Sequence, residues 1–159
     1  MPDLSESTLP ESAELRVLIV DDDPDVADAL AGLLELMGCR TTVAFGGESG
    51  LRMLQLFKPG LVFLDLGMPG YDGVGVMHRA KTFGQADGAM YVCLTGNKYE
   101  EDRALASGFD RFVHKPMTMD KLSEILSEAR ARSVVQDHWR LKSVDGTSSA
   151  FSEAGPPMN

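Results

Sequence analysis

Residues 15–38 read LRVLIVDDDPDVADALAGLLELMG, and this stretch decides the fold. Its first six residues are apolar apart from one arginine, which is typical of a strand buried on both faces of a parallel sheet. After three acids, apolar residues recur every three or four positions, as they do on one face of a helix. Asp23 and Pro24 supply a cap and a first-turn proline, and Gly38 is a helix terminator. The stretch therefore predicts a strand, a short acidic loop and a helix.

The same pattern recurs along the chain. Further apolar runs lie at 40–45, 61–64, 89–94 and 109–113, of which the first is the weakest. Helical spacing follows them at 47–57, 72–84, 97–107 and 118–131. Strands that alternate with single helices through short loops and right-handed crossovers form a doubly wound α/β sandwich. The sequence therefore predicts one α/β domain with a five-stranded parallel sheet flanked by five helices.

Composition narrows the function. The 159 residues suit one domain. With 43% hydrophobic residues, a domain of this size can bury a core large enough to fold without a stabilising disulfide or metal ion. A net charge of −9 argues against nucleic acid and anionic membranes as partners, because both are bound mainly through clustered Lys and Arg. The two cysteines, Cys39 and Cys93, have no zinc or redox spacing, and we expect buried free thiols. The chain shows no targeting segment or apolar run of membrane-spanning length, so a cytoplasmic protein is expected.

Both ends of the chain differ from its centre in composition. Residues 1–14 are rich in Ser, Pro and Glu, and 143–159 are small, polar and proline-terminated. We expect a disordered N-terminal tail over 1–14, a domain over 15–131 and a C-terminal tail over 132–159. In that tail the last helix extends to about residue 142, and Trp139 either packs on the domain or anchors a partner.

Polar side chains follow four of the five predicted strands. They are the acidic run 21–23, Asp65, Thr95 and Lys115, the last followed by Pro116. In a doubly wound sheet, ligands bind outside the carboxyl ends of the strands, where the winding reverses direction. An acidic run by itself is more often a solvated helix cap, and one of these acids is expected to cap. The conjunction of all four groups favours a binding site at this edge.

Carboxylates brought together at adjacent strand ends repel one another unless a counter-ion lies among them. Mg²⁺ suits such a site because it prefers oxygen ligands and is usually held by one or two carboxylates plus a phosphate oxygen. A third carboxylate is then free for chemistry, and Asp65 is the candidate nucleophile toward phosphorus. Lys115 and Thr95 are the candidate donors to the developing charge. Mn²⁺ accepts the same ligands and remains an alternative.

Four motifs, in family order, make 15–130 resemble a receiver domain of a two-component response regulator of bacteria. They are VLIVDDDPDV, LVFLDLGMPGYDG, VCLTG and GFDRFVHKP. The resemblance implies a flavodoxin-like fold with strand order 2-1-3-4-5 and phosphoryl transfer from phosphohistidine onto Asp65. It also implies that Asp22, Asp65 and the Gly67 backbone carbonyl hold Mg²⁺ directly, and that Asp21 acts through bound water.

The resemblance further implies a conformational switch. On phosphorylation the Thr95 hydroxyl moves toward the phosphoryl group and an aromatic ring, here Phe112, turns inward. The face of the fourth helix, fifth strand and fifth helix then changes its partner binding. Phe112 lacks the hydroxyl of the commoner tyrosine, and a core role for its ring stays open. Gly67 and Asn97 stand where the family lines the route of water to the acyl phosphate, so the sequence leaves the phosphoryl lifetime open.

This interpretation is a stand-alone receiver, a self-phosphorylating switch that hydrolyses its phosphoryl group slowly and is not a turnover enzyme. Its expected partners are a histidine kinase or histidine phosphotransfer protein and a downstream protein, as a monomer or a phosphorylation-dependent dimer. Relay, sink and effector roles remain alternatives. So do a Mg²⁺-dependent phosphohydrolase that uses Asp65 or Asp21, and a pseudo-receiver that binds partners without phosphate. Gly67 counts against the hydrolase because it offers no general acid.

Overall fold

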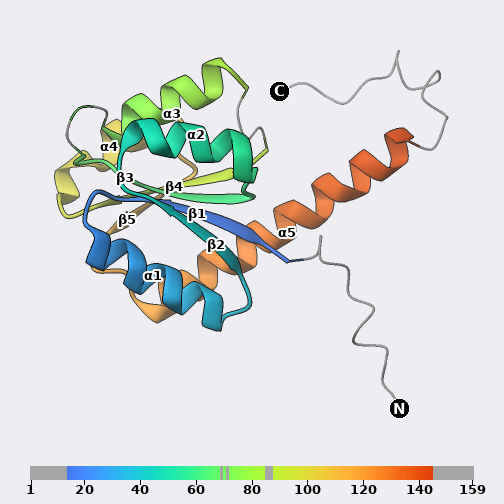
Figure 1. Ribbon diagram of the computed structural model, residues 1–159, viewed down its shortest axis with the longest axis horizontal. Helices are drawn as coiled ribbons and strands as arrows, with labels where there is room; N and C mark the ends of the chain where they lie inside the picture. Colours follow the sequence, from blue (N-terminus) through green and yellow to red (C-terminus); the bar gives the residue numbers. More distant parts are fainter. Residues whose placement is uncertain (1–13, 69, 71, 85–87, 145–159) are drawn as a thin grey trace.

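The computed structural model describes residues 14–68, 70, 72–84 and 88–144, with side chains described as far as residue 133. Five strands alternate with helices along the chain (Figure 1). The strands are β1 (Arg16–Val20), β2 (Arg40–Ala44), β3 (Leu61–Asp65), β4 (Met90–Thr95) and β5 (Arg111–His114). The helices are α1 (Pro24–Leu36), α2 (Gly47–Phe57), α3 (Gly73–Thr82), the 3₁₀ turn η3 (Lys98–Glu100), α4 (Glu101–Ala106) and α5 (Met119–Val144).

The strands form one parallel sheet in the order β2-β1-β3-β4-β5. The predicted fold class, a doubly wound five-stranded sheet of flavodoxin-like order flanked by five helices, is therefore confirmed. The chain passes from β1 to β2 on one side and then crosses back to β3 on the other side of β1, so the winding reverses between β1 and β3. Ligand sites of such sheets lie at this point, beyond the carboxyl ends of the strands.

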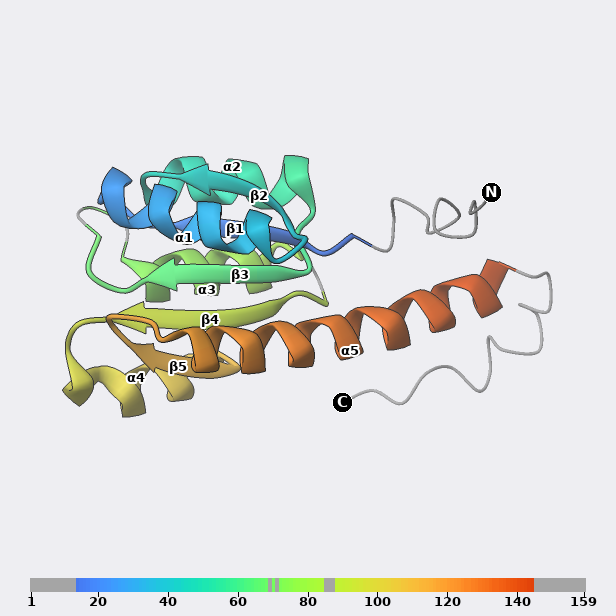
Figure 2. The same ribbon diagram turned by 90° about the horizontal axis from the view of Figure 1, so that it is seen from below.

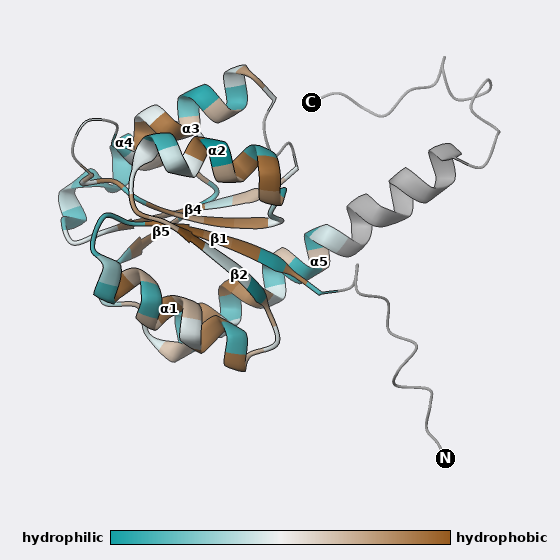
Figure 3. Ribbon diagram, in the orientation of Figure 1, coloured by the Kyte–Doolittle hydropathy of each residue, from teal (hydrophilic) through white to brown (hydrophobic). Residues whose placement is uncertain are grey.

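Alternate residues of the buried strands enter two different apolar clusters. Ile19 and Phe63 pack in one cluster with α1 and α5, and their neighbours Val20 and Leu64 pack in the other with α2, α3 and α4. Two helical layers thus enclose the sheet, as Figures 1 and 2 show from two directions. Apolar residues concentrate on the strands between the layers, and hydrophilic residues on the outer helix faces (Figure 3). Burial on both faces explains why the strand sequences do not alternate.

The start of α1 follows from its cap. The Asp23 carboxylate accepts hydrogen bonds from the backbone N–H groups of Asp25, at 3.0 Å, and Val26, at 3.4 Å. Pro24 is the first helical residue, where the missing N–H costs nothing. The acid that caps is therefore Asp23, and Asp21 and Asp22 are left for the sheet edge.

One predicted helix is divided in two, and one predicted strand begins later than expected. The segment expected as one helix over 97–107 is the short turn η3 followed by α4. The fifth strand begins at Arg111 and not at 109, because Gly108 has a φ of +102° and the N–H of Phe109 still bonds to the carbonyl of Ala104, at 3.4 Å. The side chain of Phe109 is buried all the same, which explains its apolar signal.

The last helix continues past the sheet, to Val144, and projects from the body of the domain (Figure 2). The interpretations of residues 1–13 and 145–159 as tails, and of the Trp139 side chain as packing group or anchor, lie outside the described residues. Among the described helices, none is both long enough and apolar enough to cross a membrane.

Candidate functional site

Three carboxylates meet at the carboxyl ends of β1 and β3. Asp21 and Asp22 follow β1, and Asp65 is the last residue of β3. One carboxylate oxygen from each lies within 4.8 Å of the others. Asp21 is fully buried and Asp65 nearly so, whereas Asp22 is exposed. The structure therefore brings the three predicted acids together, with one of them facing solvent.

Local hydrogen bonds orient the two buried acids. Asp21 Oδ1 accepts a hydrogen bond from the N–H of Asp23 at 3.0 Å, and Asp65 Oδ1 accepts one from the N–H of Gly67 at 3.2 Å. Burial raises the pKa of the Asp65 carboxyl above its ordinary value. The Gly67 N–H and the Lys115 ammonium oppose this rise, and the neighbouring Asp21 adds to it. Holding Asp65 ionised therefore depends on positive charge nearby.

Lys115, which follows the carboxyl end of β5, supplies that charge. Its Nζ lies 2.9 Å from Asp21 Oδ2 and 3.6 Å from Asp65 Oδ1. Its backbone N–H donates to the carbonyl of Thr95 at 2.7 Å, and the Lys115–Pro116 peptide is cis. Burial alone would lower the pKa of Lys115, but the hydrogen bond to Asp21 and the two carboxylate charges raise it overall. The lysine and the acids thus stabilise each other's charged forms.

The predicted hydroxyl, Thr95, is at the end of β4 and is 4% exposed. Its Oγ1 accepts a hydrogen bond from the N–H of Asn97 at 3.0 Å and donates one to Glu100 Oε1 at 3.1 Å. The sequence did not single out Glu100. An acid in a first helical turn usually interacts with the helix dipole, so the sequence could not predict that Glu100 contacts Thr95.

Phe112 lies in β5 beside Cys93 of β4. Its ring is half-buried and packs against the cluster formed by α2, α3 and α4. Next to Lys115, the Nε2 of the exposed His114 lies 3.0 Å from the carbonyl oxygen of Gly96. His114 therefore bridges the neighbouring strand ends and is absent from the acidic cluster.

The residues fit a hard divalent cation. Carboxylate oxygens are the preferred ligands of Mg²⁺, and one oxygen from each of three carboxylates lies within 4.8 Å of the others. Asp22 is exposed, which leaves room for the waters that Mg²⁺ retains. For Gly67 the structure records the N–H bond to Asp65, and its carbonyl remains a predicted ligand.

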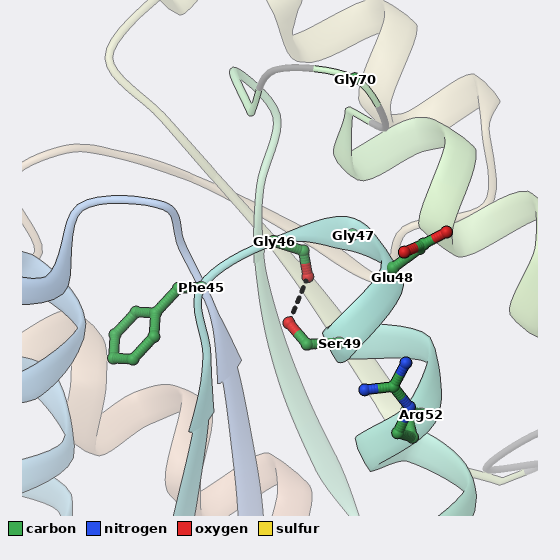
Figure 4. A pocket seen from close by; sticks show the side chains of 7 residues that line it. All are labelled: Phe45, Gly46, Gly47, Glu48, Ser49, Arg52 and Gly70. Atoms are coloured by element: carbon green, nitrogen blue, oxygen red, sulfur yellow. Dashed lines mark hydrogen bonds between the residues drawn. The ribbon is translucent and has the colours of Figure 1, made fainter.

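Figure 4 shows a separate, open pocket. It is formed by the β2–α2 turn, the first turns of α2 and Gly70 of the loop after β3, and its lining includes none of the three clustered acids. Ser49 Oγ donates to the carbonyl of Gly46 at 3.2 Å, which holds the turn closed. The side chains of Glu48 and Arg52 border the pocket on the α2 side.

Comparisons with known proteins agree on one family. Residues 17–127 match the response regulator receiver domain family. An uncharacterised 14.6 kDa protein of Leptolyngbya boryana is 34% identical over 118 residues, which are 73% of this chain and 90% of that protein. The DNA-binding response regulator MtrA of Mycolicibacterium smegmatis is 35% identical over 119 residues, which are 74% of this chain and 50% of that protein.

A solved structure confirms the fold. The CheY-like response regulator receiver domain protein from Methanospirillum hungatei has a TM-score of 0.69 at 24% identity. The match covers 77% of this chain and 98% of that one. The chain spans only about half the length of the transcriptional regulators that it matches.

Proposed function

The chain belongs to the response regulator receiver family, and on that premise we propose that it accepts a phosphoryl group on Asp65 from a histidine kinase or a histidine phosphotransfer protein. The observation that carries the proposal is the juxtaposition of Asp65 with a second buried acid, Asp21, and with the ammonium of Lys115. Such a site concentrates charge of both signs around one carboxylate, as phosphoryl transfer requires.

In the proposed reaction a carboxylate oxygen of Asp65 attacks phosphorus, and the bond from phosphorus to the donor's imidazole nitrogen breaks. That nitrogen keeps the electron pair, and Asp65 becomes an acyl phosphate. Asp21, Asp22 and Asp65, together with the Gly67 carbonyl, are the groups proposed to hold Mg²⁺. When bound, Mg²⁺ or Mn²⁺ would neutralise charge on the phosphoryl oxygens.

The chain's own donors complete the site in this proposal. Lys115 Nζ, already 3.6 Å from Asp65 Oδ1, donates to a phosphoryl oxygen. The Thr95 hydroxyl donates to another, which draws the loop after β4 toward the site. Phe112 then moves further into the space beside β4, and the face of α4, β5 and α5 changes its affinity for a downstream protein.

The test is intact mass after incubation with Mg²⁺ and acetyl phosphate. The native chain should gain one phosphoryl adduct that a chelator prevents. Asp65→Asn should gain none, whereas the matched control Asp28→Asn should behave as the native chain does, because Asp28 is exposed on α1 and outside the cluster.

Three results would contradict the proposal. An adduct on Asp65→Asn would place the acceptor elsewhere. Steady release of phosphate from a small phosphomonoester, without a stable adduct, would indicate the phosphohydrolase. No adduct with either acetyl phosphate or a phosphohistidine donor would favour the pseudo-receiver.

A further inference from the structure

The single hydroxyl proton of Thr95 already has an acceptor. Oγ1 lies 3.1 Å from Glu100 Oε1, and its lone pair accepts the Asn97 N–H at 3.0 Å. A hydroxyl has one proton to donate, so a phosphoryl oxygen on Asp65 can receive it only if Glu100 loses it. A carboxylate is among the strongest acceptors in proteins, so this competition is costly.

Glu100 is itself held in place by a chain of ion pairs. Its Oε2 lies 3.5 Å from Arg103 Nη1, and Arg103 Nη2 lies 2.6 Å from Asp72 Oδ2. The other oxygen of Asp72 accepts the N–H of Gly75 at 2.9 Å and so caps α3. We call Thr95, Glu100, Arg103 and Asp72 the Glu100 latch. It joins the end of β4, through the start of α4, to the start of α3.

The position of Glu100 argues against a role as an ordinary helix cap. It occupies the N-cap position of α4, yet its side chain makes no capping hydrogen bond there. Here it is turned to Thr95, and its side chain remains only 30% exposed. The Glu100 side chain therefore contacts the Thr95 hydroxyl and not the N–H groups at the start of α4.

We propose that Glu100 is a positioning residue that holds the Thr95 hydroxyl in the unphosphorylated orientation and so sets the threshold of the switch. This inference rests on the proposed phosphorylation of Asp65. A phosphoryl group places about −1.5 to −2 charges on Asp65, and its oxygens then compete with the Glu100 carboxylate for the one proton of Thr95. When Thr95 turns to the phosphoryl group, Glu100 leaves, and the ion pair to Arg103 transmits the change to α4.

The experiment uses beryllium fluoride with Mg²⁺, a mimic of a phosphoryl group on a carboxylate, and measures its affinity by calorimetry. Glu100→Gln should bind it about three- to tenfold more tightly than the native chain, because an amide oxygen is a weaker acceptor than a carboxylate. Glu101→Gln removes the same charge one residue away, from an exposed side chain of α4, and should change the affinity little.

A second background isolates the hydrogen bond from charge and from folding effects. In Thr95→Val there is no hydroxyl proton to compete for, so Glu100→Gln should no longer tighten binding there. Should Glu100→Gln not fold, Glu100→Asp keeps the charge, withdraws the acceptor by one methylene and should act in the same direction.

The possible failures are distinguishable. If the native chain binds beryllium fluoride and Glu100→Gln binds it equally or more weakly, the latch is wrong and the proposed function stands. The latch is equally wrong if the gain persists in the Thr95→Val background. If neither the native chain nor any variant binds beryllium fluoride or acquires a phosphoryl adduct, the proposed function itself fails.

Discussion

Replacing Gly73 by alanine tests how closely α3 is packed on the candidate site. Gly73 is the first residue of α3 and is buried. A Cβ at this position would lie 2.6 Å from the carbonyl oxygen of Asp65, 3.1 Å from its carbonyl carbon and 3.2 Å from the Cα of Leu66. All three atoms belong to the backbone, so no flexible side chain can move to make room. Either α3 or the end of β3 has to shift.

The size of the effect follows from two opposing contributions. Overpacking a rigid site costs about 1–3 kcal/mol. Alanine in place of glycine in a helix recovers at most about 1 kcal/mol, and less at a first-turn position. We therefore expect Gly73→Ala to lower the free energy of unfolding by roughly 1–2 kcal/mol. Because the clash falls on Asp65 itself, the rate of phosphoryl uptake should also fall in protein that is still fully folded.

The assay is urea unfolding followed by far-ultraviolet circular dichroism, with Gly32→Ala as the matched control. Gly32 lies in α1, and a Cβ there would meet nothing within 4 Å. The same chemical change should therefore raise the free energy of unfolding by about 0.5–1 kcal/mol. A Gly73→Ala protein as stable as the native chain, or a Gly32→Ala protein destabilised to the same extent, would refute the packing argument.

Three further predictions concern charge and titration. Mg²⁺ at a hundredfold excess over its Kd should stabilise the chain by about 2.7 kcal/mol in thermal or urea unfolding. Asp22→Asn should reduce this stabilisation, and Asp28→Asn should not. Equal stabilisation of both variants and the native chain would exclude the acidic cluster as the Mg²⁺ site. Burial, with the Glu100 and Asp65 carboxylates, raises the pKa of Cys93 to about 12. Its thiolate fraction at pH 8 should therefore be about a thousandth of that of a thiol with pKa 9.0. Iodoacetamide should modify Cys93 only after the protein unfolds, and rapid labelling of the folded protein would contradict the burial. Burial alone would raise the pKa of Asp72, but the Gly75 N–H and the Arg103 guanidinium hold it below its ordinary value. The ionised Asp72 carboxylate therefore contributes fully to stability at neutral pH, and this contribution is lost as the pH falls through the lowered pKa. Asp72→Asn should make the free energy of unfolding, measured with urea, depend less on pH on the acid side. An unchanged dependence would show that the ion pair contributes nothing to stability.

Much of the fold could be predicted because its signals are local. The apolar run before Asp21 and the helical spacing after Pro24 depend only on neighbours in sequence, and both predicted elements are present. The predicted start of β5 was wrong because the chain turns at Gly108, after α4, before it enters the strand. Phe109 is buried although it is not in a strand, so the apolar character of this residue could not show where β5 begins.

For the candidate site, the sequence by itself determined which chemical groups follow which strands. It could not determine their burial: Asp21 and Asp22 are consecutive, yet one is fully buried and the other exposed. Nor could it determine the contact of Lys115 with Asp21, 94 residues away, or the choice of Glu100 as the acceptor for Thr95. Those contacts were decided only by the tertiary structure. The register of parallel strands sets which strand ends meet, and the distances between charges then decide which of them pair.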